Sequence, residues 1–190
     1  MSLPPKRVAD SATDMVQVVL PNDANLLGSI LGGTVMHLVD IAGAIAAHRH
    51  TRSLVVTAAV DGLQFLHPIR VGDLILLRAR VTATFRTSLE VEVEVFSEES
   101  LTGRRQLTSR AYLTFVAIVP DGARVPVPPL LLENDEDRRR AEAAVLRREE
   151  RLRKKAEMEG GKDSRESRGS KESKENKERA GGRRRQAKSR

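Results

Sequence analysis

An aspartate in an apolar segment is the residue of this sequence whose surroundings most require a chemical explanation. Asp40 lies within Met36–Ala44, and no Lys or Arg occurs between Ser29 and His48 to pair with it. A carboxylate among apolar residues is unfavourable unless it is hydrogen-bonded or reaches a cleft. One interpretation is structural, with Asp40 accepting a hydrogen bond from another strand or subunit. The other is that Asp40 acts as a general base.

A glycine pair and an asparagine upstream of Asp40 offer hydrogen-bond donors. Gly32 and Gly33 come directly before a long apolar segment that we expect to be helical. Free N–H groups in the first turn of a helix bind negative oxygen, and glycine lets a ligand approach closely. The pair could therefore hold a developing oxyanion, or it could be an ordinary flexible turn. Asn25 could donate its amide to a carbonyl oxygen, or it could close an Asx turn.

Several other kinds of catalytic site are absent from the sequence. The chain has no cysteine, which excludes a cysteine nucleophile, a disulfide scaffold and Cys-ligated zinc. It has 4 histidines without metal-ligand spacing, and no Gly-x-Ser-x-Gly elbow, P-loop or dinucleotide fingerprint. We therefore expect no metal site and no cofactor. His37 is expected to lie in the core, and His48 and His50 to be charge partners at the end of the helix.

One buried helix and a series of strands would position these groups. Residues 34–50 form an almost wholly apolar segment with many small residues, which is typical of a buried helix. Alternating apolar residues predict strands at 15–20, 54–60, 74–85, 89–95 and 105–119. The last four follow one another through short turns, which parallel neighbours do not allow. The pattern predicts an α+β fold in which a meander-like antiparallel sheet covers the helix nearly all round.

The net charge of +7 comes entirely from the C-terminal end of the chain. Residues 160–190 carry 12 Lys and Arg against 5 Asp and Glu and have almost no apolar side chains, so we expect a disordered basic tail. Such a tail can contact RNA, anionic lipid or acidic partners without specificity, and the alternative is that it only keeps the protein in solution. An aromatic share of 3% argues against a stacking platform for nucleic acid, and we expect no specific nucleic-acid partner.

The changes in composition divide the chain into four parts. We expect an N-terminal extension at 1–13, one domain at 14–132, a charged helix at 133–159 and the tail at 160–190. Asn134 and Asp137 have the spacing of a helix cap at the start of the charged helix. No apolar run approaches the roughly 20 residues of a membrane span. The first residues lack the apolar centre of a secretion signal, so a cytoplasmic location is expected.

Six short motifs in order resemble the hotdog-fold acyl-CoA thioesterases, and within them the cytosolic acyl-CoA hydrolase group. The similarity runs from about Val16 to Leu132. The motifs are Leu20-Pro21-Asn22-Asp23-Ala24-Asn25, Leu31-Gly32-Gly33-Thr34-Val35-Met36, Leu38-Val39-Asp40-Ile41-Ala42-Gly43, Val60-Asp61-Gly62-Leu63-Gln64-Phe65, Pro68-Ile69-Arg70-Val71-Gly72-Asp73 and Val125-Pro126-Val127-Pro128.

The resemblance implies a five- to six-stranded antiparallel sheet wrapped around one long central helix. It also implies a homo-oligomer, a dimer or a hexamer built as a trimer of dimers, with active sites at the subunit interface. Asn25 of one subunit and the N–H of Gly33, beside Gly32, would polarise the thioester carbonyl of an acyl-CoA. Asp40 of the other subunit would activate water or attack directly.

The resemblance further implies that basic and hydroxyl residues at a strand turn meet the CoA nucleotide. The candidates are Arg86, Thr87 and Ser88. CoA would be part of the substrate, so no cofactor is implied. The alternatives are a non-catalytic acyl-CoA-binding regulatory module and a dehydratase of the same fold. The isolated carboxylate of Asp40 argues against the first, and the absence of a convincing catalytic histidine argues against the second.

Overall fold

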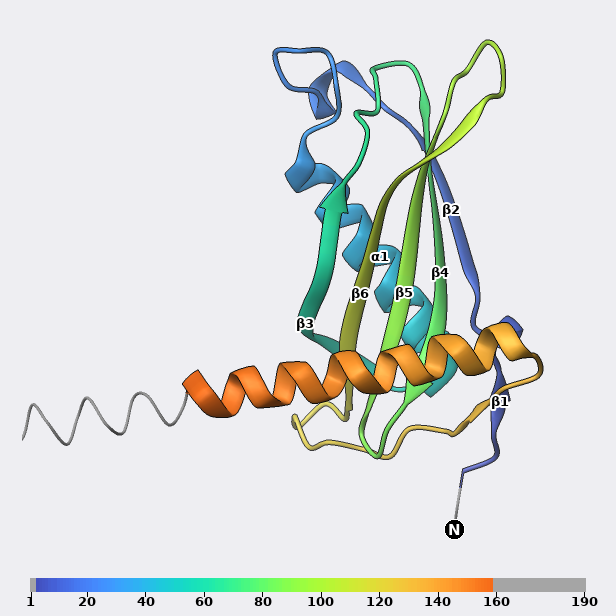
Figure 1. The fold of residues 1–190 in the computed structure, drawn as a ribbon, viewed down its shortest axis with the longest axis vertical. Coiled ribbons are helices and arrows are strands. Elements are labelled where there is room, and N and C mark those ends of the chain that lie inside the picture. The colour runs from blue at the N-terminus through green and yellow to red at the C-terminus, as the bar shows by residue number, and fades with distance from the viewer. Residues whose placement is uncertain (1–2, 159–190) are drawn as a thin grey trace, which may run out of the picture. The chain divides into compact units, whose positions relative to one another are not determined.

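A computed structural model describes residues 3–158 of the chain. It divides into two units, Met1–Val145 and Leu146–Arg190. The first unit contains one long helix, α1 (Gly32–Thr51), and a five-stranded sheet in the order β2-β4-β5-β6-β3 (Figure 1). The strands are β2 (Thr13–Val18), β3 (Leu54–Phe65), β4 (Leu74–Thr84), β5 (Ser88–Glu98) and β6 (Arg105–Ile118). The predicted tail at 160–190 lies outside the described residues.

The sheet is antiparallel throughout, as predicted, but it is not a simple meander. β4, β5 and β6 follow one another as neighbours, whereas β3 pairs with β6 at the far edge and β2 pairs with β4 at the other edge. The segment after β3 therefore passes β6 and β5 and enters β4 near the opposite edge of the sheet. The length of the connection between β3 and β4 did not predict this order. It limits how far apart the two strands can be, but it does not say whether they are neighbours.

The helix α1 packs on the inner face of the sheet through small residues. A Cβ atom on Gly43 would lie 3.1 Å from the ring of Phe115 and 3.6 Å from Val93, so glycine allows α1 to approach β5 and β6 closely. Both of those side chains are fully buried. Deleting the side chain of a buried Phe costs about 3–5 kcal/mol of folding free energy, so this contact fixes where α1 lies.

The expectation that the sheet covers the helix nearly all round is wrong for a single chain. Met36 is 49% exposed, His37 is exposed and Asp40 is only half-buried, and all three lie on one side of α1. A sheet curves around one side of a helix, and the other side of α1 here has no cover within the described residues. His37 is accordingly not a core histidine.

The outer face of the sheet carries a row of buried carboxylates. Glu90, Glu92 and Glu94 on β5 are 1%, 3% and 9% exposed. Arg80 and Arg110 on the neighbouring strands approach Glu94 at 2.9 and 2.6 Å. The alternation of β5 thus produces a strand that is buried on both faces within one chain.

A second helix, at residues 135–158, begins after β7 (Leu130–Leu131). Asn134 caps it, because its Oδ1 accepts a hydrogen bond from the backbone N–H of Asp137 at 2.8 Å, so the predicted capping pair is confirmed. Arg140, which belongs to the first unit, places its Nε 3.2 Å from a carboxylate oxygen of Glu92. In the second unit the described residues 146–158 continue as helix and include a Lys154–Glu150 ion pair at 2.7 Å.

A parallel pair of short strands holds the C-terminal end of α1. β1 (Lys6–Arg7) pairs with β7, and the Lys6 ammonium donates to the backbone oxygen of His50 at 2.6 Å. His50 is fully buried with its Nε2 3.0 Å from the carbonyl oxygen of Pro128. Burial lowers the pKa of the His50 imidazole, so His50 is not the charged partner that the sequence suggested.

Candidate active site

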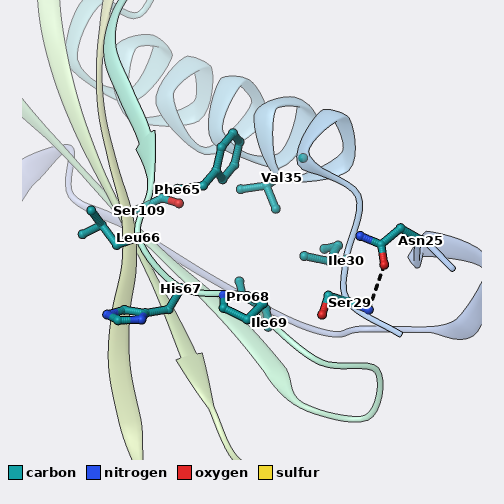
Figure 2. A pocket seen from close by; sticks show the side chains of 11 residues that line it. Asn25, Ser29, Ile30, Val35, Phe65, Leu66, His67, Pro68, Ile69 and Ser109 are labelled. Atoms are coloured by element: carbon teal, nitrogen blue, oxygen red, sulfur yellow. Dashed lines mark hydrogen bonds between the residues drawn. The ribbon is translucent and has the colours of Figure 1, made fainter. Parts of the chain in front are cut away.

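A pocket of about 350 Å³ lies at the N-terminal end of α1. Its walls come from the loop before α1, from the first turn of α1 and from the end of β3 with the following loop (Figure 2). Most of its lining is apolar, with Ile30, Val35, Phe65 and Ile69 among the side chains. A pocket of this kind, apolar with a few convergent polar groups, is the usual form of a small-molecule site.

Asn25 lines the pocket with its amide held in one orientation. Its Oδ1 accepts hydrogen bonds from the backbone N–H groups of Leu27 at 2.9 Å and Ser29 at 3.3 Å. Figure 2 shows the second of these bonds. The Asx-turn interpretation is therefore correct for the amide oxygen. It does not exclude a binding role, because the oxygen fixes the loop while the Nδ2 donor has no hydrogen-bond partner among the described residues.

The glycine pair forms the first turn of α1, two residues earlier than the predicted helix start. Leu31 is the N-cap residue and supplies no side-chain hydrogen bond, so no side chain occupies the first N–H groups of α1. Gly32 lines the pocket, and a Cβ atom there would lie 3.4 Å from the ring of Phe65. A Cβ atom on Gly33 would meet nothing within 4 Å, so its backbone is open to a ligand.

Asp40 has a hydrogen-bond donor that the sequence analysis did not identify. The Thr57 hydroxyl on β3 donates to Asp40 Oδ1 at 2.6 Å, which confirms that another strand supplies a partner to this carboxylate. Thr57 is exposed, and Asp40 is half-buried rather than buried as expected. The bond orients one carboxylate oxygen and leaves Oδ2 without a hydrogen bond from the described residues. A signal was present in the sequence: Thr57 is the one polar residue in the otherwise apolar segment 54–60.

Asp40 does not line the pocket that contains Asn25 and Gly32. Asp40 is seven residues after Gly33 on α1, so it lies on the same side of the helix about 10 Å further along its axis. A carboxylate at that distance cannot reach a carbonyl group bound at the first turn of its own helix. One chain thus holds the donors and the carboxylate on one exposed side of α1 but does not bring them together.

Arg86, Thr87 and Ser88 lie at the opposite end of the sheet from the pocket. β4 starts beside the pocket loop, where the N–H of Val71 donates to Gly28, and ends at the turn of these three residues about 35 Å away. Thr87 is buried, and its carbonyl oxygen accepts from the N–H of Ala117 at 3.0 Å. Within one chain, therefore, these residues do not join the pocket.

A second, polar groove adjoins the pocket and contains two arginines. It has a volume of about 220 Å³ and shares His67 and Pro68 with the pocket. Arg70 and Arg104 line it, together with two acidic residues. Arg70 belongs to the motif at residues 68–73, but neither arginine was predicted as a site residue, because nothing in their spacing distinguishes them from other surface charges.

No group of three or more His, Asp or Glu side chains in residues 3–158 is arranged to hold a metal ion. In the same residues, no helix is both long enough and apolar enough to span a membrane.

Comparison with known proteins identifies the family. The sequence model of the thioesterase superfamily matches residues 27–104. The uncharacterized acyl-CoA thioester hydrolase YkhA of Bacillus subtilis is 39% identical over 137 residues, which are 72% of this chain and 80% of the relative. The human cytosolic acyl coenzyme A thioester hydrolase is 34% identical over 140 residues, 73% of this chain. The chain spans only 37% of the length of that human relative.

Solved structures agree with the sequence relatives. An apo-hexameric acyl-CoA thioesterase superposes with a TM-score of 0.77 at 40% identity, covering 80% of this chain and 97% of that one. The acyl-CoA hydrolase of Staphylococcus aureus, solved with butyryl-CoA and CoA, has a TM-score of 0.77 at 32% identity and covers 82% and 95%. Alanine variants of an aspartate, an asparagine and a threonine of that enzyme are also solved.

The three substituted positions are spaced along the Staphylococcus chain as Asn25, Asp40 and Thr57 are spaced along this one. The family model, the sequence relatives and the solved structures confirm the resemblance inferred from six short motifs and the hotdog α+β fold. This chain belongs to the thioesterase superfamily and, within it, to the acyl-CoA thioester hydrolases, a family of enzymes.

Proposed function

We propose that this chain hydrolyses acyl-CoA thioesters to a free fatty acid and CoA, at sites that two copies of the chain complete together. The observation that carries the proposal is the position of Asp40. Its carboxylate is oriented by Thr57 on an exposed side of α1, yet it lies too far along the helix to serve the pocket of its own chain. A second copy of the same exposed side would supply it.

The pocket end would bind and polarise the thioester. The carbonyl oxygen accepts hydrogen bonds from Asn25 Nδ2 and from the backbone N–H of Gly33, where the positive end of the α1 dipole also favours negative charge. Charge develops on that oxygen as the tetrahedral intermediate forms, so donors fixed before the reaction lower its barrier. The Asx turn keeps Asn25 fixed without using its donor.

Asp40 of the neighbouring chain would either activate a water molecule for attack on the thioester carbonyl carbon or attack that carbon itself. As a general base it takes a proton from water, whose oxygen then forms a bond to the carbonyl carbon. As a nucleophile it forms that bond itself, giving an anhydride that water hydrolyses. On both routes the carbon–sulfur bond breaks, and the CoA thiolate leaves and takes up a proton. Neither route needs a metal or a cofactor.

The assembly would be a dimer, or a hexamer made of three such dimers, joined through the free edge of β3. That edge strand has exposed apolar residues on the face toward α1, among them Val60 at 46% and Phe65 at 53%. A long apolar edge strand left unpaired is a template for pairing with another strand. The similarity to a hexameric thioesterase supports the larger assembly.

The CoA nucleotide would extend from the pocket toward cationic side chains. Arg86, Thr87 and Ser88 stay our candidates, contributed by a neighbouring chain because they lie far from the pocket of their own. A cytoplasmic location is proposed from the name of the human relative.

Release of free CoA thiol from a panel of acyl-CoAs of increasing chain length tests the activity. The chain has no cysteine, so a thiol reagent reports only the product. Asp40→Asn keeps the side-chain shape and can still accept the Thr57 hydrogen bond, but it can neither take a proton nor attack. We expect kcat to fall by about 10²–10⁴-fold with the oligomer intact.

Mixing two inactive variants tests the shared site. Asn25→Ala and Asp40→Asn subunits, co-refolded in equal amounts, form hybrid dimers in which one of the two sites has both residues intact. Random assembly would restore about a quarter of wild-type activity, since half of the dimers are hybrids. No recovery would show that both residues act within one chain. Acyl-CoA binding without turnover by the wild-type protein would instead favour the non-catalytic binding module.

A further inference from the structure

The pocket contains one buried hydroxyl that the proposed reaction does not use. Ser109 on β6 is 1% exposed and lines the pocket. It lies in the inward-facing row of β6, where the residues that follow at alternate positions are Ala111, Leu113 and Phe115, each of them fully buried. A serine therefore interrupts an apolar row at the point where the row reaches the pocket.

The Ser109 hydroxyl has no hydrogen-bond partner among residues 3–158. The neighbouring Thr108 shows the contrast, because its buried hydroxyl donates to the carbonyl oxygen of Val95 at 3.0 Å. Figure 2 shows the Ser109 oxygen beside Phe65 at the pocket wall. A ligand that fills the pocket would keep water away from this hydroxyl, so a ligand atom that pairs with it gains affinity over one that leaves it unpaired.

The position of Ser109 relates it to the reacting end of the substrate. Ser109 pairs directly with Phe65 in the register of β3 and β6, so their side chains lie on the same face. The ring of Phe65 extends from there to Gly32, where a Cβ atom would meet it at 3.4 Å. One aromatic side chain therefore spans the pocket from Ser109 to the first turn of α1. A carbonyl group bound at that turn would place the first few acyl carbons near Ser109.

We propose that Ser109 is a specificity-determining residue that selects acyl groups carrying an oxygen a few carbons from the thioester, such as 3-hydroxyacyl or 3-oxoacyl groups. This inference rests on the proposed hydrolase function. A plain alkyl chain would fill the pocket and leave the hydroxyl unpaired, whereas an oxygenated chain would pair with it. A site that hydrogen-bonds a substrate oxygen discriminates against the analogue that lacks it.

The test compares butanoyl-CoA with 3-hydroxybutanoyl-CoA, each enantiomer separately, in the wild-type protein, Ser109→Ala and Ser109→Thr. The two substrates differ by one oxygen, so their kcat/KM ratio cancels general effects of a substitution. We expect the wild type to favour one hydroxylated enantiomer by about fivefold to tenfold, the value of one hydrogen bond. Ser109→Ala should abolish the ratio, because it removes the hydrogen bond to the hydroxylated substrate and also the hydroxyl that the plain substrate leaves unpaired. Ser109→Thr should keep the ratio.

Ser109→Ala loses no protein hydrogen bond and places alanine in a row that already contains it, so the variant should fold. Thermal unfolding checks this. A wild-type ratio near one overturns the inference. So does an equal loss for both substrates in Ser109→Ala, which would mean that Ser109 contacts the pantetheine common to all acyl-CoAs.

If neither four-carbon substrate is hydrolysed, the panel of longer acyl-CoAs decides whether the proposed function fails, and this inference stays testable by binding. Calorimetric titration of the same two CoA esters into wild type and Ser109→Ala then provides the readout. Tighter binding of the hydroxylated ester that is lost in the variant supports the role of Ser109. Equal affinities overturn it.

Discussion

The strands β5 and β3 are both rich in apolar residues, but their surroundings in one chain are opposite. β5 is buried on both faces, with its valines against α1 and its glutamates against arginines from β4, β6 and the second helix. β3 is exposed over most of its length, including Val56 at 45% and Val60 at 46%. From the sequence alone, the valines of β5 and those of β3 cannot be told apart, because both are ordinary strand residues.

The difference separates what one chain completes from what it leaves open. The glutamates of β5 form ion pairs with arginines of the same chain, so this part of the structure is complete in a single folded chain. The exposed apolar residues of β3, such as Val56 and Val60, and the exposed side of α1 are not covered by any of the described residues, although Val55 and Leu63 of β3 pack on the core. The carboxylate of Asp40 lies between these two incomplete surfaces, which is why its chemistry depends on assembly in our proposal.

The largest expected effect follows from placing a charge on the inward face of β3. Val60 pairs with the fully buried Leu113 in register, so it lies on the same face as α1, and Val60→Glu would place a carboxylate in the proposed interface. Burying an unpaired charge is strongly unfavourable. We expect dissociation to single chains and loss of hydrolysis, measured by light scattering after size exclusion and by thiol release.

Val56→Glu is the matched control. Val56 has nearly the same exposure but pairs with Val116, on the outward face of the sheet. That variant should keep the assembly and most of the activity. Equal dissociation by both variants would contradict an interface on the inner side of β3.

An intermediate effect is expected from the closed side of the molecule. Arg140→Met removes the cation whose Nε lies 3.2 Å from Glu92 Oε2, an oxygen without a well-directed hydrogen bond even in the wild type. The Glu92 side chain is 5% exposed, and the cations that remain near it are the more distant Arg80 at 3.7 Å and Arg110 at 3.6 Å. We expect the free energy of unfolding to fall by about 1–3 kcal/mol in denaturant titrations, with kcat of the folded protein unchanged.

Arg138→Met supplies the comparison on the same helix. Its ion pair with Asp135 has side chains 54% and 85% exposed, and such surface pairs contribute about 0–1 kcal/mol. If Arg138→Met destabilised the protein as much as Arg140→Met, the buried carboxylate row would not be the reason for the effect.

The smallest effect concerns the end of α1 that β1 and β7 hold. Burial lowers the pKa of His50 below its ordinary value of 6.5, so the unfolded chain binds more protons than the folded one as the pH falls below about 6.5. Stability is therefore fully present above pH 6.5 and declines as the pH falls below it. His50→Gln can still donate to the Pro128 carbonyl oxygen, and its unfolding temperature should decline less between pH 7.5 and pH 5.5. An equal decline in both proteins would assign the pH dependence to other groups.

The sequence predicted the elements well wherever one chain determines them. The alternation in residues 89–95 identified β5, and the apolar segment at 34–50 identified α1. β3 extends beyond its predicted end because Gly62, with φ of 67°, forms part of an irregularity within the strand instead of a turn. Its pairing with β6 depends on distant residues, so local pattern could not reveal it.

The candidate site was only partly accessible to sequence reasoning. The sequence predicted Asp40 as a site residue because it is a charged residue in an apolar segment. It predicted Asn25 and Gly32 because they can offer hydrogen-bond donors just before the same helix. Thr57 and Ser109 could not be identified from the sequence, because their roles depend on tertiary contacts. Thr57 faces the Asp40 carboxylate, and Ser109 faces the pocket. A polar residue in an apolar row is the signal that both share, and it is weak because most such residues simply hydrogen-bond the backbone.

The parallel pair of β1 and β7 has a consequence for the order of folding. Lys6 and Leu130 are paired in space although almost the whole domain separates them in sequence, so their pairing closes a very long loop. Such contacts are entropically costly until the intervening chain is organised, and they form late. The Lys6 hydrogen bond to the end of α1 would then be among the last to appear in refolding.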